Sequence, residues 1–130
     1  MSDKMVEIFH EYVHGYLEWS LWETTALLCG IDPKLSMQEY MNSIMEMYDV
    51  EHSLGTSRIV INVWNDLRKW GCWNKDKKKV SQFFIINQLI INKISMPDKL
   101  LELICKKAKK LNIDYSYNPM IKVEIDKRNF

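Results

Sequence analysis

Apolar residues recur along most of this chain at the three- and four-residue spacing of an amphipathic helix. Residues 3–17 show the pattern first. One face of that segment collects the apolar side chains Met5, Ile8, Phe9, Tyr12, Val13 and Tyr16. Four Gly and three Pro in 130 residues leave few positions for hairpin turns, which argues against an all-β fold. The pattern predicts an all-α fold.

Capping signals divide this pattern into five or six short helices. Ser20 with Glu23, and Ser36 with Glu39, have the spacing of a capping box, in which two side chains satisfy orphan N–H groups at a helix start. Gly30 suits the left-handed conformation that follows a last helical turn. The remaining helix starts are predicted at Gly55, Ser81 and Pro97.

The chain beyond residue 111 has a different pattern. Ile121, Val123 and Ile125 alternate with charged residues, which is typical of an extended segment. The length suits a single domain. We therefore expect one helical domain over residues 1–111, with an extended C-terminal tail over residues 112–130 that packs on it or trails from it.

The overall net charge of +1 hides an uneven distribution along the sequence. Residues 1–65 contain 3 basic and 10 acidic side chains, whereas residues 66–130 contain 15 basic and 7 acidic ones. The two halves therefore carry −7 and +8. A chain polarised in this way can attract its own other half, a polyanion or a charged partner.

Two groups of lysines supply much of the positive charge. They are Lys75, Lys77, Lys78 and Lys79 in a polar loop, and Lys106, Lys107, Lys109 and Lys110 at the end of the last helix. Lysines at a helix C-terminus stabilise the macrodipole by about 0.3–1 kcal/mol each without any partner. The acidic N-terminal half also offers intramolecular counter-charges. The functional alternative is nucleic acid, since lysines that neutralise phosphates release counterions.

Five tryptophans are many for so small a domain, and four of them lie at predicted helix ends. These four are Trp19, Trp22, Trp70 and Trp73. Packing in the core is the simpler interpretation. If they are exposed, they form a binding hot spot together with Met and Tyr side chains. A similarly adaptable interface is offered by the methionine-rich helix, which contains Met37, Met41, Met45 and Met47.

One segment matches the pattern of zinc peptidases. In His10-Glu11-Tyr12-Val13-His14, two histidines one helical turn apart can bind Zn²⁺, and the glutamate can act as general base. Catalysis also needs a third ligand and a substrate cleft, and the sequence marks neither. At 100° per residue the three polar side chains point away from the apolar stripe. A solvated polar face is therefore the preferred interpretation of this motif.

Two blocks of the sequence form a further pattern. Residues 19–33 combine a tryptophan, a capped helix and the exit Leu27-Leu28-Cys29-Gly30-Ile31-Asp32-Pro33, and a later block covers residues 80–100. Both blocks resemble segments of small uncharacterised helical proteins from proteobacterial phages, plasmids and genomic islands. The chain departs from the later block at Gln82, where Pro is usual, and at Ile86-Asn87, where Trp-Ala is usual. The resemblance implies a genomic context and supplies no catalytic residue.

These observations together predict a non-enzymatic accessory protein of a mobile genetic element. We expect it to bind a protein partner as a regulator or inhibitor, and to need no cofactor or metal. Nucleic-acid binding through the basic half is the first alternative, and a zinc-dependent peptidase is the second. Three widely spaced cysteines and the lack of a long apolar run predict a cytoplasmic protein with reduced thiols and no membrane partner.

Overall fold

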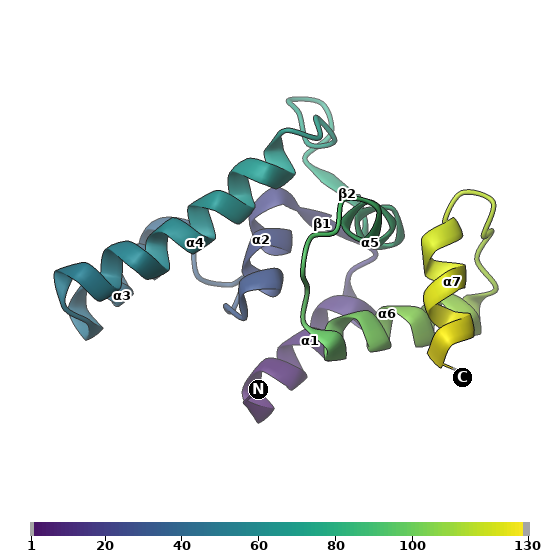
Figure 1. The fold of residues 1–130 in the computed structure, drawn as a ribbon, viewed down its shortest axis with the longest axis horizontal. Helices are drawn as coiled ribbons and strands as arrows, with labels where there is room; N and C mark the ends of the chain where they lie inside the picture. The colour runs from purple at the N-terminus through teal and green to yellow at the C-terminus, as the bar shows by residue number, and fades with distance from the viewer. Residues whose placement is uncertain (1, 129–130) are drawn as a thin grey trace. The chain divides into compact units, whose positions relative to one another are not determined.

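The computed structural model describes residues 2–128, which form seven α-helices and one small sheet (Figure 1). The helices are α1 (Asp3–Gly15), α2 (Leu21–Cys29), α3 (Met37–Met47), α4 (Val50–Arg68), α5 (Gln82–Ile91), α6 (Asp98–Leu111) and α7 (Pro119–Arg128). Strands β1 (Glu18–Ser20) and β2 (Lys79–Ser81) pair with each other. The predicted all-α class is confirmed. None of the described helices is both long enough and apolar enough to cross a membrane.

The chain divides into two compact units, whereas the sequence suggested one helical domain. Unit 1 comprises residues 1–19 and 80–130, and unit 2 comprises residues 20–79. Unit 2 therefore interrupts the sequence of unit 1. Both passages from one unit to the other lie within the short strands β1 and β2.

Unit 1 is built from α1, α5, α6 and α7. Helix α1 packs on α6, and α7 packs on both α5 and α6. The amphipathic faces predicted from the sequence supply the fully buried side chains of this unit, such as Phe9, Ile86, Ile104 and Ile121. Apolar burial of this kind is the main stabilising contribution to such a unit.

The end of α1 is held by a buried polar side chain from α5. Gln82 is fully buried, and its Nε2 donates hydrogen bonds to the carbonyls of Val13 at 3.2 Å and Tyr16 at 2.8 Å. The last carbonyls of a helix have no partner within the helix, so an amide from another element is an effective substitute. Gln82 therefore connects two helices that lie 66 or more residues apart in the sequence.

The predicted extended tail is helical over residues 119–128. Ile121 and Ile125 are four residues apart and both buried, whereas Val123 between them is exposed. This is the burial pattern of a helix. The buried Asn87 of α5 accepts a hydrogen bond from the Met120 N–H at 2.9 Å, which satisfies one of the free donors at the start of α7. The prediction of an extended segment here is wrong.

Unit 2 is organised around α4, on which both α2 and α3 pack. Its buried cluster consists of Ala26, Ile31 and Val60, against which four half-buried side chains pack: Trp22, Cys29, Tyr40 and Met41. Both predicted capping boxes are present, at the starts of α2 and α3. Gly30 has a φ of 73° and ends α2, as predicted.

Helix α4 begins earlier than predicted. Its N-cap is Asp49, whose Oδ1 accepts a hydrogen bond from the His52 N–H at 2.7 Å. Gly55 lies inside the helix, although the sequence suggested that a helix begins there. Glycine inside a helix lowers the stability of that helix by about 1 kcal/mol relative to alanine. The packing of the nineteen-residue helix α4 offsets this loss. At 1.5 Å per residue, α4 is about 27 Å long.

Candidate partner-binding site

The tryptophans predicted to form a binding surface are not freely exposed. Trp19 is buried, and its indole Nε1 donates to the Tyr12 carbonyl at 3.0 Å. Trp22 is half-buried and donates to the Leu35 carbonyl at 2.6 Å. Trp70 and Trp73 are half-buried as well. The hot-spot prediction is wrong for Trp19, and for Trp22 the hydrogen bond and the core contacts point to a packing role.

The first lysine group lies in the exposed loop between α4 and β2. Asn74 shapes this loop, because its Oδ1 accepts hydrogen bonds from the N–H groups of Asp76 and Lys77, each at 2.9 Å. Lys79 forms an ion pair with Glu23 at 3.5 Å. All four lysines of the group are exposed. One of the four lysines thus meets a carboxylate of the acidic half.

The second lysine group lies on α6 in unit 1, and its members differ in environment. Lys106 pairs with Glu102 of the same helix at 2.9 Å. Lys107 is half-buried, donates to the Val13 carbonyl at the end of α1 and lies 5.9 Å from the centre of the Phe83 ring. Burial lowers the pKa of the Lys107 ammonium. Lys109 and Lys110 are exposed. Lys107 therefore has a structural role.

The charge polarity of the two sequence halves does not correspond to the two units. Unit 1 contains ten basic and nine acidic residues, and unit 2 contains eight of each. Within unit 2, however, acidic side chains gather around the start of α4 and basic ones around its end, with Arg58 and Asp66 between them. Residues 35–57 contain four acidic and no Lys or Arg side chains, whereas residues 68–79 contain six basic and one acidic. Unit 2 alone thus has an acidic and a basic end. The acidic side chains lie at the N-terminal end of α4 and the basic ones at its C-terminal end, and this arrangement stabilises the helix macrodipole.

The two histidines of the zinc-like motif lie on the exposed face of α1. Their rings stack with a centroid distance of 5.6 Å. Slight burial, together with the charges of His10, Lys107 and Lys110, lowers the pKa of His14. Within residues 2–128, no group of three or more His, Cys, Asp or Glu side chains comes together in a way that could hold a metal ion.

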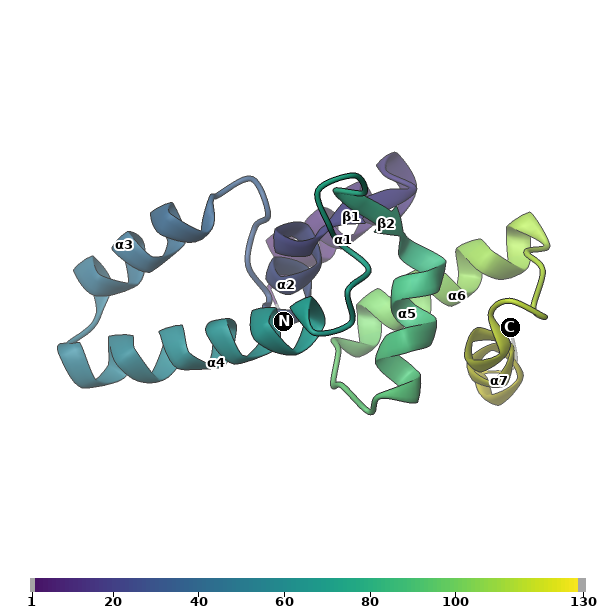
Figure 2. The ribbon, with the colours of Figure 1, turned by 90° about the horizontal axis from the view of Figure 1, so that it is seen from above.

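The main apolar surface of unit 2 lies instead on the hairpin of α3 and α4. A link of two residues, Tyr48 and Asp49, joins these helices, which run side by side (Figure 2). On α4, Val50, Leu54, Ser57 and Ile61 follow one another at positions i, i+4, i+7 and i+11. This spacing places them on one face, called here the α4 stripe. Val50 is 77% exposed and Leu54 58%, so none of the described elements covers this part of the stripe.

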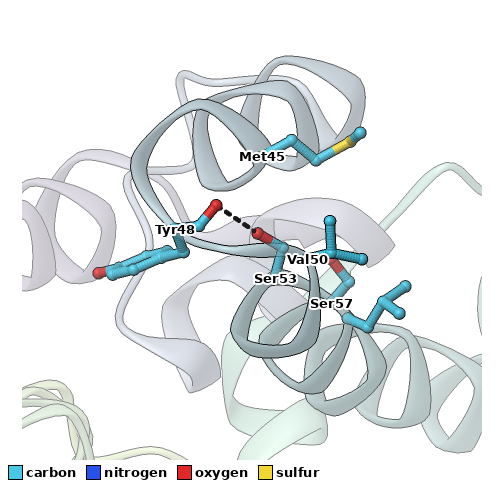
Figure 3. Close-up of a pocket in the computed structure, with 6 residues that line it drawn as sticks. Met45, Tyr48, Val50, Ser53 and Ser57 are labelled. Atoms are coloured by element: carbon cyan, nitrogen blue, oxygen red, sulfur yellow. Dashed lines mark hydrogen bonds between the residues drawn. The ribbon is translucent and has the colours of Figure 1, made fainter.

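A small pocket opens where the stripe meets α3 (Figure 3). It has a volume of about 130 Å³, and we refer to it as the hairpin pocket. Its lining residues are Met45, Tyr48, Val50, Ser53, Leu54 and Ser57. Met45, from α3, is 70% exposed and borders the pocket opposite Val50. The surface of the pocket is therefore mostly apolar and accessible.

One buried hydroxyl fixes the geometry of the hairpin pocket. Ser53 is buried, and its Oγ donates to the Ile44 carbonyl at 3.1 Å. The same Oγ lies 3.4 Å from the Tyr48 carbonyl, and Figure 3 shows this second contact. Both carbonyls belong to the C-terminal end of α3, where the Ile44 carbonyl also accepts a hydrogen bond from the Tyr48 N–H at 3.0 Å. Ser53 thus holds the end of α3 against the first turn of α4.

The segment that carries the hairpin pocket is rich in acidic side chains. Glu46, Asp49 and Glu51 are exposed and adjoin Met45, Tyr48 and Val50 in the sequence. Among the described residues, no ion pair engages any of the three carboxylates. We refer to them as the acidic rim.

Sequence reasoning identified only part of this site. The methionine-rich helix was recognised as a possible interface, and Met45 and Met47 are indeed exposed, whereas Met37 and Met41 are half-buried. The α4 stripe was missed because the helix start was placed at Gly55. The signal was present, since Asp49 is a favourable N-cap and the stripe has helical spacing from Val50 onward.

Comparisons with known proteins assign no family to the chain. No protein-family model, no curated protein and no solved structure matches it.

Proposed function

We propose that this protein is a non-enzymatic binding protein that docks a protein partner on the hairpin of α3 and α4. The observation that carries the proposal is the exposed α4 stripe beside an apolar pocket. Single exposed apolar residues are normal on a protein surface, but contiguous apolar patches mark interaction sites.

The residue types at the hairpin also favour a protein partner. Met and Tyr are enriched at the centres of protein interfaces. Burial of a Val, Leu or Met side chain contributes roughly 1.5–3 kcal/mol, so Met45, Val50 and Leu54 together offer a substantial contribution to affinity. The flexible Met45 side chain can adapt to the shape of the partner.

The biological setting is part of the same proposal. The resemblance of residues 19–33 and 80–100 to small proteins of phages, plasmids and genomic islands supports a role as an accessory protein of a mobile element. Such a protein would act as a regulator or inhibitor, by occupying a surface of its partner.

The proposal is tested by affinity purification from the native host with three forms of the full chain. Leu54→Asp places a charge on the α4 stripe, and Leu17→Asp is a matched control because both leucines are 58% exposed. We expect the same partner with the wild type and with Leu17→Asp, and a loss of at least tenfold with Leu54→Asp. Equal capture by all three forms would refute docking at the hairpin. Circular dichroism confirms that both variants are folded.

A second candidate function, nucleic-acid binding, is favoured by one observation at the basic end of unit 2. The Arg68 guanidinium lies 5.2 Å from the centre of the Trp64 ring, next to an exposed loop that carries Lys75, Lys77 and Lys78. Basic side chains that alternate with aromatic rings are typical of single-strand binding.

The nucleic-acid alternative makes its own prediction. It requires DNA or RNA affinity that falls steeply with salt and with the double substitution Lys77→Glu/Lys78→Glu. Purification from nuclease-treated and untreated lysates separates the two candidates. A partner lost on nuclease treatment supports nucleic acid, whereas a retained partner supports protein.

A further inference from the structure

We infer that the occupant of the α4 stripe and hairpin pocket is an amphipathic helix of a partner protein, with Lys or Arg residues beside its apolar face. This inference rests on the proposed function and specifies the chemistry of the partner. Three features carry it: the shape of the stripe, the size of the pocket and the sign of the rim.

The shape of the stripe fits a helix. From Val50 to Ile61 the stripe covers twelve residues, and its first and last Cα atoms lie about 16 Å apart along α4. Helices bind in grooves between other helices through apolar residues at the same i, i+3, i+4 and i+7 spacing. A helix laid along α4 would contact Met45 and the whole stripe together, whereas a compact loop would cover only part of that length.

The size of the pocket fits one large apolar side chain. An apolar cavity of about 150 Å³ accommodates a benzene molecule. The hairpin pocket, at about 130 Å³, therefore suits a single Leu, Met or Phe side chain of the partner helix. The remaining apolar residues of that helix would lie on the stripe, over Leu54 and Ile61.

The negative charge of the acidic rim favours positively charged residues on the partner helix. Residues 45–57, which supply every lining residue of the pocket, contain the exposed Glu46, Asp49 and Glu51 and no Lys or Arg, so this segment attracts a partner with Lys or Arg beside its apolar face. Complementary charge accelerates association and rejects partners of the wrong sign. A second copy that placed its own hairpin pocket against this one would bring two acidic rims together, which disfavours that arrangement.

The test uses the full chain and three labelled model peptides that share one apolar face. Each peptide is about 18 residues long, so that it can form a helix, and carries Leu at the spacing of the α4 stripe. The polar positions beside the leucines are Lys, Gln or Glu. Binding is measured by fluorescence anisotropy, for the wild type and for Leu54→Asp.

The inference predicts a defined order of affinities. The Lys peptide should bind at least about fivefold more tightly than the Gln peptide, and the Glu peptide more weakly still. Leu54→Asp should reduce the affinity for the Lys peptide at least tenfold. The double substitution Glu46→Lys/Glu51→Lys should reverse the order. Its control is Glu7→Lys/Glu18→Lys, which makes the same change of charge on exposed positions of unit 1 and should preserve the order.

The contrary outcomes separate this inference from the proposed function. Three peptides of equal affinity, all sensitive to Leu54→Asp, would overturn the preference for a basic partner and leave hairpin docking intact. If no peptide binds at the hairpin, the helical occupant is overturned, while capture of the natural partner continues to test the proposed function. A dimer of the wild type that Leu54→Asp dissociates, detected by analytical ultracentrifugation, would identify a second copy as the occupant and overturn the inference.

Discussion

The hydroxyl of Ser53 donates a hydrogen bond to the carbonyl of Ile44, at 3.1 Å, and so ties the start of α4 to the end of α3. Ser53 is buried, and its Oγ also lies 3.4 Å from the Tyr48 carbonyl. This contact determines how α3 and α4 border the hairpin pocket. The stability of unit 2 and the shape of its candidate site therefore depend on the same small side chain.

Replacement of this hydroxyl is expected to weaken unit 2. Ser53→Ala should lower the free energy of unfolding by about 1–2 kcal/mol, because the Tyr48 carbonyl loses this side-chain donor and the Ile44 carbonyl keeps only the Tyr48 N–H. Ser57→Ala is the matched control, since it makes the same change one turn further along α4 at a half-buried position. Both variants gain the same helix propensity, so their difference in urea denaturation isolates the hydrogen bonds. Equal stabilities would show that the Ser53 contacts contribute nothing.

Gln82 gives a corresponding prediction for unit 1. Gln82→Met keeps the length of the side chain but removes the donor to the carbonyls of Val13 and Tyr16. We expect a loss of about 1–2 kcal/mol in the free energy of unfolding. The control is Gln88→Met, a half-buried position on the same helix, which should be nearly neutral. Gln82 Oε1 is buried and has no hydrogen-bond partner among the described residues. A neutral or stabilising result would therefore mean that removing this unpaired oxygen outweighs the loss of the two hydrogen bonds.

The thiols should differ in reactivity. Burial raises the pKa of Cys29 to about 11, from an ordinary value of 9.0. The thiolate is the reactive form, so at pH 8 Cys29 should alkylate about 100-fold more slowly than an ordinary thiol. Its rate should rise about tenfold per pH unit until the pH approaches this pKa. Cys29 and Cys72 are both half-buried, but the charge of Lys77 counteracts the rise that burial causes in the pKa of Cys72, so Cys72 should react first. Cys105 is fully buried, with its pKa raised to about 11, and should react slowly. Mass spectrometry of an iodoacetamide time course measures all three, and equal rates for Cys29 and Cys72 would contradict the prediction.

Arg128 is expected to control the titration of Asp98. The Arg128 guanidinium donates to Asp98 Oδ1 at 2.7 Å and lowers the pKa of that carboxyl below its ordinary value of 3.8. A lowered pKa means that the contact stabilises the fold above pH 3.8, and that this stabilisation is lost as the pH falls through the lowered value. In Arg128→Gln, the NMR midpoint of Asp98 should therefore rise.

The control for this titration is Asp114. Hydrogen bonds from Ser116 lower the pKa of Asp114, and Arg128 plays no part in them. Its midpoint should stay unchanged in Arg128→Gln. An Asp98 midpoint that also stays unchanged would show that the contact between α6 and α7 is not maintained in solution.

The sequence predicted those elements whose signals are local. Ser20 with Glu23, and Ser36 with Glu39, form the expected capping boxes because each box needs only four consecutive residues. The helix over residues 119–128 was missed because Ile121, Val123 and Ile125 fit both a strand and a helix, and the partner of its first turn is Asn87, far away in the sequence. Such a long-range hydrogen bond has no signature in the local pattern.

The candidate site shows the same division between local and distant signals. The exposure of Met45 and Met47 is compatible with the methionine-rich pattern noted in the sequence. The burial of Trp19 depends on the Tyr12 carbonyl, and the environment of Trp22 depends on the Leu35 carbonyl, so neither could be predicted from the number of tryptophans. The acidic rim was visible only as part of a charge imbalance between the sequence halves, because the boundaries of the units were unknown.

The way in which unit 2 interrupts unit 1 has a consequence for how the chain can be divided. The ends of unit 2 are close together, since Glu23 pairs with Lys79 at 3.5 Å, and the Gln82 N–H donates to the Leu17 carbonyl at 3.0 Å on the unit 1 side. Segments whose ends meet are tolerated as insertions into surface turns of other proteins. Residues 20–79 should therefore be transplantable as a self-contained cassette, with the hairpin pocket and its acidic rim intact, into a host that lacks any binding activity of its own.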